Sequence, residues 1–492
     1  MNEGPLRDGV EPSVYGGCGV VGDGDTAAMP DHIAGGSAHQ ASAGEPTGAL
    51  PPGAYRSYAL GLLVLVYVFN FIDRSILGIL VQPIKEDLGV SDTAMGFLGG
   101  IAFATFYTVL GIPLARIADR GNRRNLLAIC LAVWSGATAL CGLAANFWQL
   151  LIARIGVAIG EAGGSPPSHS MISDLFPVSQ RATALGIYAL GIPIGTMLGN
   201  LGGGWINENM EWRTAFLIVG LPGVVLALIV RLTLREPVRG AADRAAGAAA
   251  AAVESDTPPP PVQEVFAYLW RRRSFRFLAI GAALHAFVGY GVGYWIAPMF
   301  ARSHDLGTGY MGTALFYIGF ASIAGTFLGG YLGDRLGRRD RRWYVWLPGL
   351  ATLISVPFSA FVYTHDNPVT ALWVLSVSYF LGAYYLGPSF ALTQSMVGTR
   401  MRALASAILL FILNIIGLGL GPQFAGILSD VLAAGFDLGQ DSLRWALVIC
   451  LIFNVISALC YLIASRTLRE DLPAVTDQVL PGGKSKASAS SA

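Results

Sequence analysis

Twelve apolar runs, each about as long as a membrane-spanning helix, account for most of this chain. In a bilayer core only helices and closed barrels satisfy all backbone hydrogen bonds, and a helix needs about 20 residues to cross it. Charged residues make up 13% of the chain, compared with about 25% in soluble domains. The sequence therefore predicts an all-α membrane protein with twelve transmembrane helices. The runs lie at about 58–82, 94–117, 125–144, 147–173, 182–206, 213–234, 277–300, 310–333, 343–363, 369–392, 403–428 and 443–465.

A segment of different composition separates the first six runs from the last six. It contains an alanine run at 248–252, four prolines at 258–261 and three arginines at 271–273, which is typical of a linker. The region before the first run is rich in Gly, Ala and Ser, and we expect both terminal regions to be disordered. The expected parts are a tail at 1–54, a six-helix bundle at 55–235, a cytoplasmic linker at 236–275, a second six-helix bundle at 276–468 and a tail at 469–492.

The two halves of the chain repeat one another. The segment 118–124 (ADRGNRR) has its counterpart at 333–339 (GDRLGRR), in the turn after the second run of each half. Equivalent turns on the same side make the repeat parallel, which places a substrate path between the two bundles near the midplane. Arginine gathers in these turns and in the linker, whereas the turns of opposite parity carry acids. The positive-inside rule therefore predicts that both termini are cytoplasmic.

Four charged residues of the first half lie deep inside apolar runs, away from the ends of the runs, namely Asp73, Arg74, Arg154 and Glu161. Charges at membrane depth are costly unless they find partners. Asp73 and Arg74 are adjacent, so on a helix they point about 100° apart and cannot pair with each other. Arg154 and Glu161 lie two turns apart on one helical face, too far apart to pair directly.

We predict that these four residues line one cavity and exchange partners. Asp73 and Glu161 would take up and release protons, because burial and a neighbouring arginine act on a carboxyl group in opposite directions. Arg74 and Arg154 would bind an anionic group of the substrate. The alternative is a buried salt-bridge network with a structural role only.

The second half lacks such charges in its first and fourth runs and carries aromatic residues instead. Tyr290, Tyr294 and Trp295 lie in its first run. A charged first half facing an aromatic second half suggests an amphipathic substrate whose tail contacts these rings. The alternative is that the rings pack between helices or anchor the protein at the membrane interface.

The arginine-rich turns supply candidate gating residues. A carboxylate next to guanidinium groups can hold one conformation and release another. The alternative is that these charges only set the orientation in the membrane. The candidates are Asp119, Arg120, Arg123, Arg124, Asp334, Arg335, Arg338 and Arg339.

The pattern Asp-Arg-x-Gly-Arg-Arg after the second and eighth runs is the signature of the major facilitator superfamily. It stands in full at 334–339, whereas Asn122 takes the glycine position in the first half. That variant, with Asp73-Arg74, Glu161 and the segment 160–166 (GEAGGSP), is similar to the Spinster branch. The resemblance covers roughly 56–470. It implies the major facilitator fold and, in members of that branch, transport of sphingoid or lysophospholipid-like lipids, proton-linked in several.

Several other functions find no support in the sequence. Lys484 lies in a Gly-Lys-Ser triplet, but Gln478 stands where a nucleotide-binding loop needs glycine. We therefore expect an ion gradient, most simply of protons, to drive the protein without a cofactor. The five cysteines have no metal-ligand spacing, and no catalytic spacing suggests an enzyme. The net charge of +1 gives no reason to expect a nucleic-acid partner.

The expected function is secondary active transport of an amphipathic, anionic, lipid-like solute by alternating access. A proton-linked antiporter of drugs or small organic anions is the alternative within transport, and a non-transporting membrane sensor is an alternative of another class. We expect a monomer that contacts membrane lipids. The preference for Arg over Lys and the Ala and Gly richness suggest a bacterial inner membrane.

Overall fold

The computed structural model describes residues 50–242, 261–398 and 401–472, and their regular secondary structure is entirely helical. The first half contains α1 (Gly53–Leu88), α2 (Asp92–Phe97), α3 (Phe103–Arg120), α4 (Arg123–Cys141), α5 (Phe147–Ala162), α6 (Ser165–Leu175), α7 (Val178–Ala189), α8 (Gly191–Asn209) and α9 (Trp212–Thr233). The second half contains α11 (Val262–Arg271), α12 (Arg273–His304), α13 (Thr308–Gly337), α14 (Trp343–Thr364), α15 (Pro368–Gly382), α16 (Leu386–Ser395), α17 (Arg402–Ile412), α18 (Gly421–Phe436) and α19 (Ser442–Asp471). The π-helical stretches Leu98–Ala102 and Leu413–Leu420 join α2 to α3 and α17 to α18.

The all-α prediction is confirmed, with one difference in the fourth span. Among the described residues, eleven helical stretches are long and apolar enough to cross a membrane. The remaining expected span, the fourth at 147–173, is divided into α5 and α6, of 16 and 11 residues. Gly163 and Gly164 separate the two helices, and Pro166 and Pro167 follow at the start of α6. Proline is tolerated in the first turn of a helix but cannot continue the preceding one, which explains the break.

Asparagine side chains begin several of these helices. Asn122 departs from the signature glycine, and its Oδ1 accepts a hydrogen bond from the Asn125 backbone N–H at 2.8 Å. Asn146 and Asn367 cap α5 and α15 in the same way. Such a cap satisfies one of the backbone donors that a helix start leaves unpaired.

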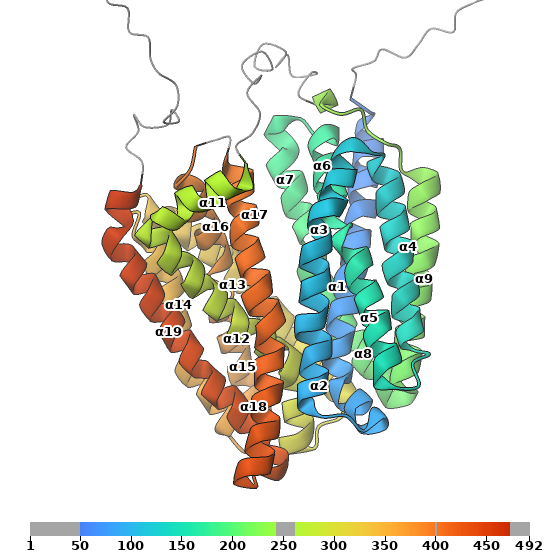
Figure 1. Cartoon of the computed structure of the whole chain (residues 1–492), viewed down its shortest axis with the longest axis vertical. Coiled ribbons are helices and arrows are strands. Elements are labelled where there is room, and N and C mark those ends of the chain that lie inside the picture. The colour runs from blue at the N-terminus through green and yellow to red at the C-terminus, as the bar shows by residue number, and fades with distance from the viewer. Residues whose placement is uncertain (1–49, 243–260, 399–400, 473–492) are drawn as a thin grey trace, which may run out of the picture. The chain divides into compact units, whose positions relative to one another are not determined.

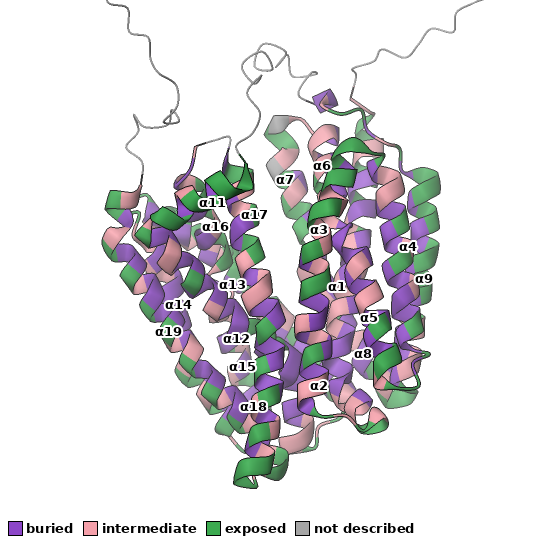
Figure 2. Ribbon diagram, in the orientation of Figure 1, coloured by how far each residue is buried: buried purple, intermediate pink, exposed green. Residues whose placement is uncertain are grey.

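The helices of each half pack mainly against helices of the same half. In the first half α1 packs on α8 and α4 on α9, and in the second half α12 and α14 pack on α19 (Figure 1). Exposed residues follow the outward sides of these helices, as on α9 (Figure 2). Glycines permit the closest approaches, because a side chain at Gly199 would overlap Ser75 and Ile72 of α1.

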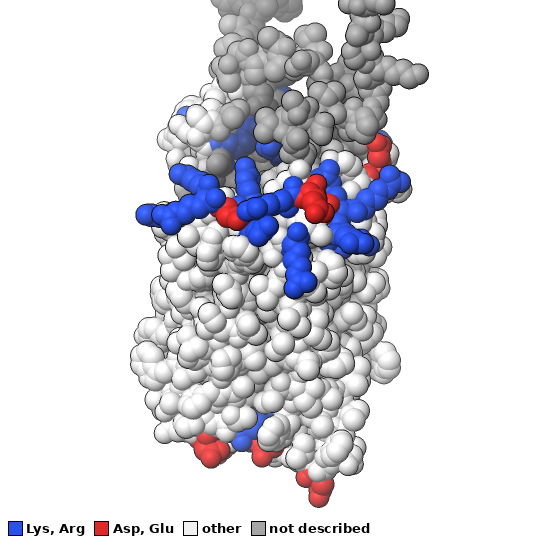
Figure 3. Space-filling model, turned by 90° about the vertical axis from the view of Figure 1, so that its left-hand side faces the viewer, with Lys and Arg blue, Asp and Glu red and all other residues white. Residues whose placement is uncertain are grey.

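The two ends of the helices differ in charge. We call the end with the α3–α4 turn, the α13–α14 turn and α11 the linker end, and the end with the α1–α2 turn the far end. Lys and Arg form a band at the linker end, whereas most charges visible at the far end are acids (Figure 3). This is the distribution that the sequence led us to expect for a membrane protein.

The two halves meet at α1 with α12, α8 with α13, and α2 with α18. At two glycines the backbones of α8 and α13 approach closely, since Gly204 faces the Thr308 carbonyl oxygen and Gly312 that of Asn200. Three parts of the predicted organisation lie outside the described residues. They are 1–49 of the N-terminal tail, 243–260 of the linker and 473–492 of the C-terminal tail. The helix α11 lies within the predicted linker, and the part boundaries stay predictions.

We predict that Gly160→Ala destabilises the first half. A Cβ atom at Gly160 would lie 2.6 Å from the Trp134 backbone nitrogen and 2.8 Å from the Cys130 carbonyl oxygen of α4. Overpacking of this kind costs about 1–3 kcal/mol, and thermal unfolding of the purified protein in detergent measures it. Gly136→Ala is the matched control, because a Cβ there meets no atom within 4 Å. Equal melting temperatures for the two variants would contradict the packing argument.

Candidate functional site

The central ion pair of the first half joins α1 to α5. Nε of Arg74 donates to Oε2 of Glu161 at 2.6 Å, and the Glu161 side chain is fully buried. Glu161 stands in the last turn of α5, directly before the break at Gly163. The break thus brings the end of a helix and a carboxylate together at membrane depth.

Aromatic rings surround the Arg74 guanidinium. Its central carbon lies 4.5 Å from the ring centre of Tyr107 and 5.2 Å from those of Phe71 and Phe103. The faces of aromatic rings attract cations, so these rings stabilise the charge without neutralising it. The guanidinium is therefore held in place by one carboxylate and a cation–π environment.

Asp73 is buried on the other side of the same helix turn and has a different environment. Its side chain is 1% exposed, and neither carboxylate oxygen has a hydrogen-bond partner among the described residues. Nη1 of Arg154 lies 3.3 Å from the backbone carbonyl oxygen of Asp73, not against its carboxylate. Glu161, Arg154 and Arg74 are the charged groups that act on Asp73 electrostatically, and the Thr138 side chain is near enough to interact with its carboxyl group.

The structure therefore brings together the four charged residues predicted from the first half. Only one carboxylate–guanidinium pair forms, and Asp73 is left with a buried, unpaired carboxyl group. An isolated buried charge of this kind is costly, and the smallest change that removes the cost is binding of a proton. Exchange of ion-pair partners requires one acid that is paired and one that is not, and Glu161 and Asp73 meet this requirement.

The three aromatic candidates of α12 occupy different positions. Tyr290 is 40% exposed, although it lies close enough to Arg74 to interact with it electrostatically. Tyr294 and Trp295 are buried, and they donate hydrogen bonds of 2.8 Å to the carbonyl oxygens of Met95 and Pro422. Tyr294 thus joins α12 to α2 of the other bundle, whereas Trp295 joins α12 to α18 of its own bundle. Their role in substrate binding stays a prediction.

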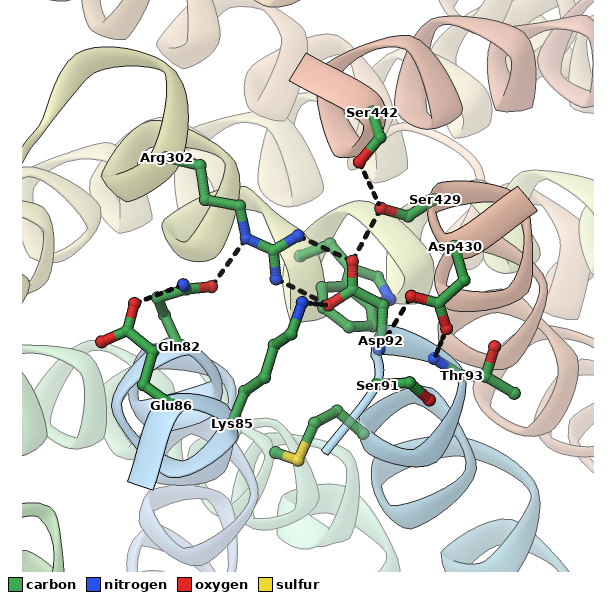
Figure 4. A network of polar contacts seen from close by, with 12 residues as sticks. Gln82, Lys85, Glu86, Ser91, Asp92, Thr93, Arg302, Ser429, Asp430 and Ser442 are labelled. Atoms are coloured by element: carbon green, nitrogen blue, oxygen red, sulfur yellow. Dashed lines mark hydrogen bonds and ion pairs between the residues drawn. The ribbon is translucent and has the colours of Figure 1, made fainter. Parts of the chain in front are cut away.

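A second polar network joins the two halves at the far end (Figure 4). Asp92, at the start of α2, accepts two hydrogen bonds of 2.6 Å from the guanidinium of Arg302 on α12. Lys85 and Ser429 each donate to the same carboxylate at 2.7 Å. Asp92 and Arg302 are almost completely buried, with side-chain exposures of 2% and 4%. Charge-assisted, bidentate bonds of this kind are the strong ones.

The helix α2 is bound to α18 by a further carboxylate in this network. Asp430 of α18 accepts from the backbone N–H groups of Asp92 and Thr93, at 3.1 and 2.7 Å. A carboxylate at a helix N-terminus interacts favourably with the helix dipole. Gln423 adds a hydrogen bond of 3.2 Å to the Thr93 carbonyl oxygen. The far end is therefore closed by contacts between the halves.

Sequence reasoning missed this network. The sequence places acids in the turns at this end but does not distinguish Asp92 among them, and it does not mark Arg302 as a site residue. The available signal was the position of Arg302, because an arginine at the acidic end of a span departs from the positive-inside pattern. Its partner could not be identified, since Asp92 is 210 residues away in the chain.

The gating candidates at the linker end contact only their own half. Arg123 is 1% exposed and pairs with Asp174 and with Glu236, its Nε lying 2.7 Å from Oε1 of Glu236. Asp119 and Arg120 are exposed and have no hydrogen-bond or ion-pair partner within the described ranges.

The corresponding residues of the second half are bound locally. Asp334 accepts from the Tyr344 hydroxyl at 3.1 Å, and Arg335 donates to the Tyr331 hydroxyl at 2.9 Å. Arg338 and Arg339 border a groove of about 380 Å³. No candidate of either turn crosses between the halves in this part of the structure, and the gating role stays a prediction.

Comparison with known proteins identifies this architecture. The sequence pattern of the Major Facilitator Superfamily matches residues 63–422. The chain belongs to the major facilitator superfamily. This facilitator is 35% identical over 421 residues to an MFS-type efflux pump of Mycolicibacterium smegmatis, covering 84% of this chain and 94% of that protein. It is 26% identical over 446 residues to protein spinster homolog 1 of Xenopus tropicalis, covering 85% and 82%.

A solved structure gives the same family relationship. A bacterial homolog to the human lysosomal transporter Spinster, in an inward-facing and unoccupied conformation, superposes with a TM-score of 0.77 at 33% identity. The match covers 86% of this facilitator and 100% of that chain. The predicted resemblance to the Spinster branch and the predicted major facilitator fold are confirmed. The chain is an integral membrane protein of a transporter family, and the family matches point to no enzyme class.

We predict that Arg302→Gln opens the far end. The substitution removes the bidentate partner that ties the buried Asp92 carboxylate to the second half, whereas Lys85 of the first half still donates to it. The cost is therefore below the about 3–5 kcal/mol of a buried charge left without any partner. Nitroxide labels on Met210→Cys and Phe436→Cys, both exposed positions of opposite halves, report the separation by pulsed electron paramagnetic resonance. The distance distribution should shift to longer values.

The control for this experiment is Arg444→Gln at the same end. Arg444 lies 3.8 and 3.7 Å from the carboxylates of Asp366 and Asp441. It also donates to the His365 carbonyl oxygen at 3.3 Å. All these partners belong to the second half, so this variant should keep the parent distances between the halves. Unchanged distances in Arg302→Gln would show that the network does not hold the far end closed.

Proposed function

We propose that this facilitator moves an amphipathic, anionic, lipid-like solute by alternating access, coupled to proton movement. A lysophospholipid or a sphingoid phosphate has the required chemistry. The observation that carries the proposal is the contrast between the two acids of the first half. Glu161 is paired with Arg74 at 2.6 Å, whereas the Asp73 carboxyl group has no hydrogen-bond partner among the described residues.

In the proposed cycle Asp73 holds a proton in the conformation described here. Transfer of a proton to Glu161 would remove the negative charge that binds Arg74, so that the guanidinium becomes free for an anionic group. Loss of the proton from Asp73 would give Arg154 a carboxylate to pair with in place of the Asp73 carbonyl oxygen. The partners are thus exchanged: the Asp73 carboxylate gains Arg154, and Arg74 is left to pair with the anionic group of the substrate.

The surroundings of Arg74 support an amphipathic substrate. A phosphate would bind to the guanidinium, whose planar donors match phosphate oxygens. The exposed ring of Tyr290 offers an apolar surface on the opposing bundle. The similarity to protein spinster homolog 1 and to the bacterial Spinster homolog supports the same direction, because the resemblance to that branch implies lipid-like substrates.

We further propose that the linker end is cytoplasmic in a bacterial inner membrane. The band of basic residues at that end supports this orientation. The described conformation, with the far end closed by Asp92 and Arg302, would then be inward-facing. The TM-score of 0.77 with an inward-facing relative is in agreement.

A second candidate is export of drugs or small organic anions. The 35% identical relative from Mycolicibacterium smegmatis is an MFS-type efflux pump, and a D-galactonate transporter of Escherichia coli is 26% identical over 437 residues. Both candidates use Arg74 as the anion ligand. Competition by galactonate or by cationic dyes against lysophospholipid transport separates them, because a lipid site built around Tyr290 should not be blocked by a small hydrophilic anion.

We predict that Asp73→Asn abolishes gradient-driven transport. Purified protein in liposomes with an imposed pH gradient should accumulate a labelled lysophospholipid, and the variant should fall to the level of protein-free liposomes. Asn is close to Asp in size but cannot exchange a proton. Asp366→Asn is the control, because that side chain is 99% exposed. If transport depends neither on the pH gradient nor on Asp73, the protein moves its substrate without proton coupling and Asp73 has a structural role.

We also predict that Tyr290→Ala changes the preference for acyl-chain length. Removing the ring deletes apolar contact worth about 1–3 kcal/mol for the tail, so short and long lysophospholipids should become less distinct in their apparent affinities. Tyr310→Ala, in the first turn of α13, is the exposed control. If chain-length preference is the same in Tyr290→Ala and in the parent, the tail does not contact this ring.

A further inference from the structure

The short helix α11 has apolar residues on two faces. Val265 and Leu269 are completely buried and belong to the core of the second half. Val262, Phe266 and Trp270 follow one another at intervals of four residues and are 55%, 41% and 39% exposed. A helix in water normally exposes polar residues opposite its buried stripe. The exposed apolar stripe of α11 therefore needs a partner.

The position of α11 places this stripe at the membrane surface. The helix packs against α12 and α17 at the linker end, as Figure 1 shows. Only Arg272 separates it from α12, which begins at Arg273 and is one of the candidate membrane spans. A helix connected so closely to the start of a span lies at the boundary between head groups and acyl chains.

A groove beside the stripe combines aromatic and cationic groups. It has a volume of about 450 Å³ and is lined by Phe266, Ala267, Trp270, Arg271 and Arg276. The rings of Phe266 and Trp270 stack with centres 5.4 Å apart and planes 14° apart. They form a flat apolar wall next to two guanidinium groups.

The two arginines of the groove lack acidic partners. Within the described ranges neither Arg271 nor Arg276 makes an ion pair, and the buried Nε of Arg276 has no hydrogen-bond partner. Their neighbour Arg272 differs, because it donates to the Tyr268 hydroxyl at 2.5 Å and to the Asp471 backbone. The Asp471 carboxylate is already occupied by Ser274, through its backbone N–H and its hydroxyl, each at 2.7 Å.

We propose that this groove binds an anionic phospholipid of the leaflet at the linker end. Arg271 and Arg276 would hold the phosphate, for which guanidinium groups are well suited, and the acyl chains would lie along Phe266 and Trp270. Basic residues near an anionic membrane surface attract its lipids. The site is separate from the proposed transport site, because it lies at the end of the second half whereas Arg74 lies inside the first.

Native mass spectrometry of the full-length protein in detergent tests the proposal. Dioleoyl phosphatidylglycerol and dioleoyl phosphatidylcholine are added separately, and the bound lipids are counted. The parent protein should retain phosphatidylglycerol in preference to phosphatidylcholine. Arg271→Ala/Arg276→Ala should weaken the apparent affinity for phosphatidylglycerol about tenfold or more. The control is Arg231→Ala/Arg466→Ala, which removes the same charge from exposed arginines of α9 and α19. Equal loss in both double variants would overturn the assignment.

Further variants separate this groove from other sources of binding. Phe266→Ser/Trp270→Ser should weaken retention of the lipid, whereas Arg74→Ala should leave it unchanged. If Arg74→Ala removes the lipid and Arg271→Ala/Arg276→Ala does not, the lipid occupies the transport site and the proposal fails. If inorganic phosphate displaces phosphatidylglycerol at the concentration at which the lipid itself binds, the groove is a site for anions and not for a lipid, and the proposal fails. Stronger retention after deletion of residues 243–258 would identify the linker as the occupant and would also overturn the proposal.

Discussion

Charged side chains in an apolar environment must be paired, solvated or neutralised, and this constraint explains where the polar contacts of the facilitator occur. In the first half, Arg74 satisfies it with Glu161 and three aromatic rings. Asp73 has no hydrogen-bond partner within the described structure. The two acids are therefore unequal although they belong to one cluster. That inequality is the physical basis for assigning them different protonation states in a transport cycle.

The same constraint acts where the two halves meet. Asp92 and Arg302 are buried together at the far end. If the halves separated there, Arg302 would lose its carboxylate partner and Asp92 would keep only Lys85 of its own half. The linker-end residues behave differently, because Arg123 pairs with Asp174 and Glu236 of its own half. Separation of the halves at the linker end leaves those pairs intact. The distribution of ion pairs thus favours a conformation closed at the far end.

Backbone geometry determines how closely the halves approach at these contacts. The glycines Gly204 and Gly312 bring α8 and α13 together without intervening side chains. The π-helical stretches Leu98–Ala102 and Leu413–Leu420 lie at the other contact, where Gly100 faces Gly419. The two contacts correspond to each other in the internal repeat, because one joins the fifth span to the eighth and the other joins the eleventh span to the second. Duplicated breaks, such as those after Ala162 and Gly382, show that the repeat extends from sequence to local structure.

The sequence alone predicts the helical class, the number of spans, the parallel repeat and the set of charged residues at membrane depth. These features depend on segment length, composition and spacing, which are local properties of the chain. It could not determine that Arg74 pairs with Glu161 rather than Asp73 with Arg154, or that Asp92 binds Arg302. It also could not distinguish exposed Tyr290 from buried Tyr294 and Trp295. These points depend on which helix faces meet, because residues 87 or 210 positions apart in the chain become neighbours only after packing.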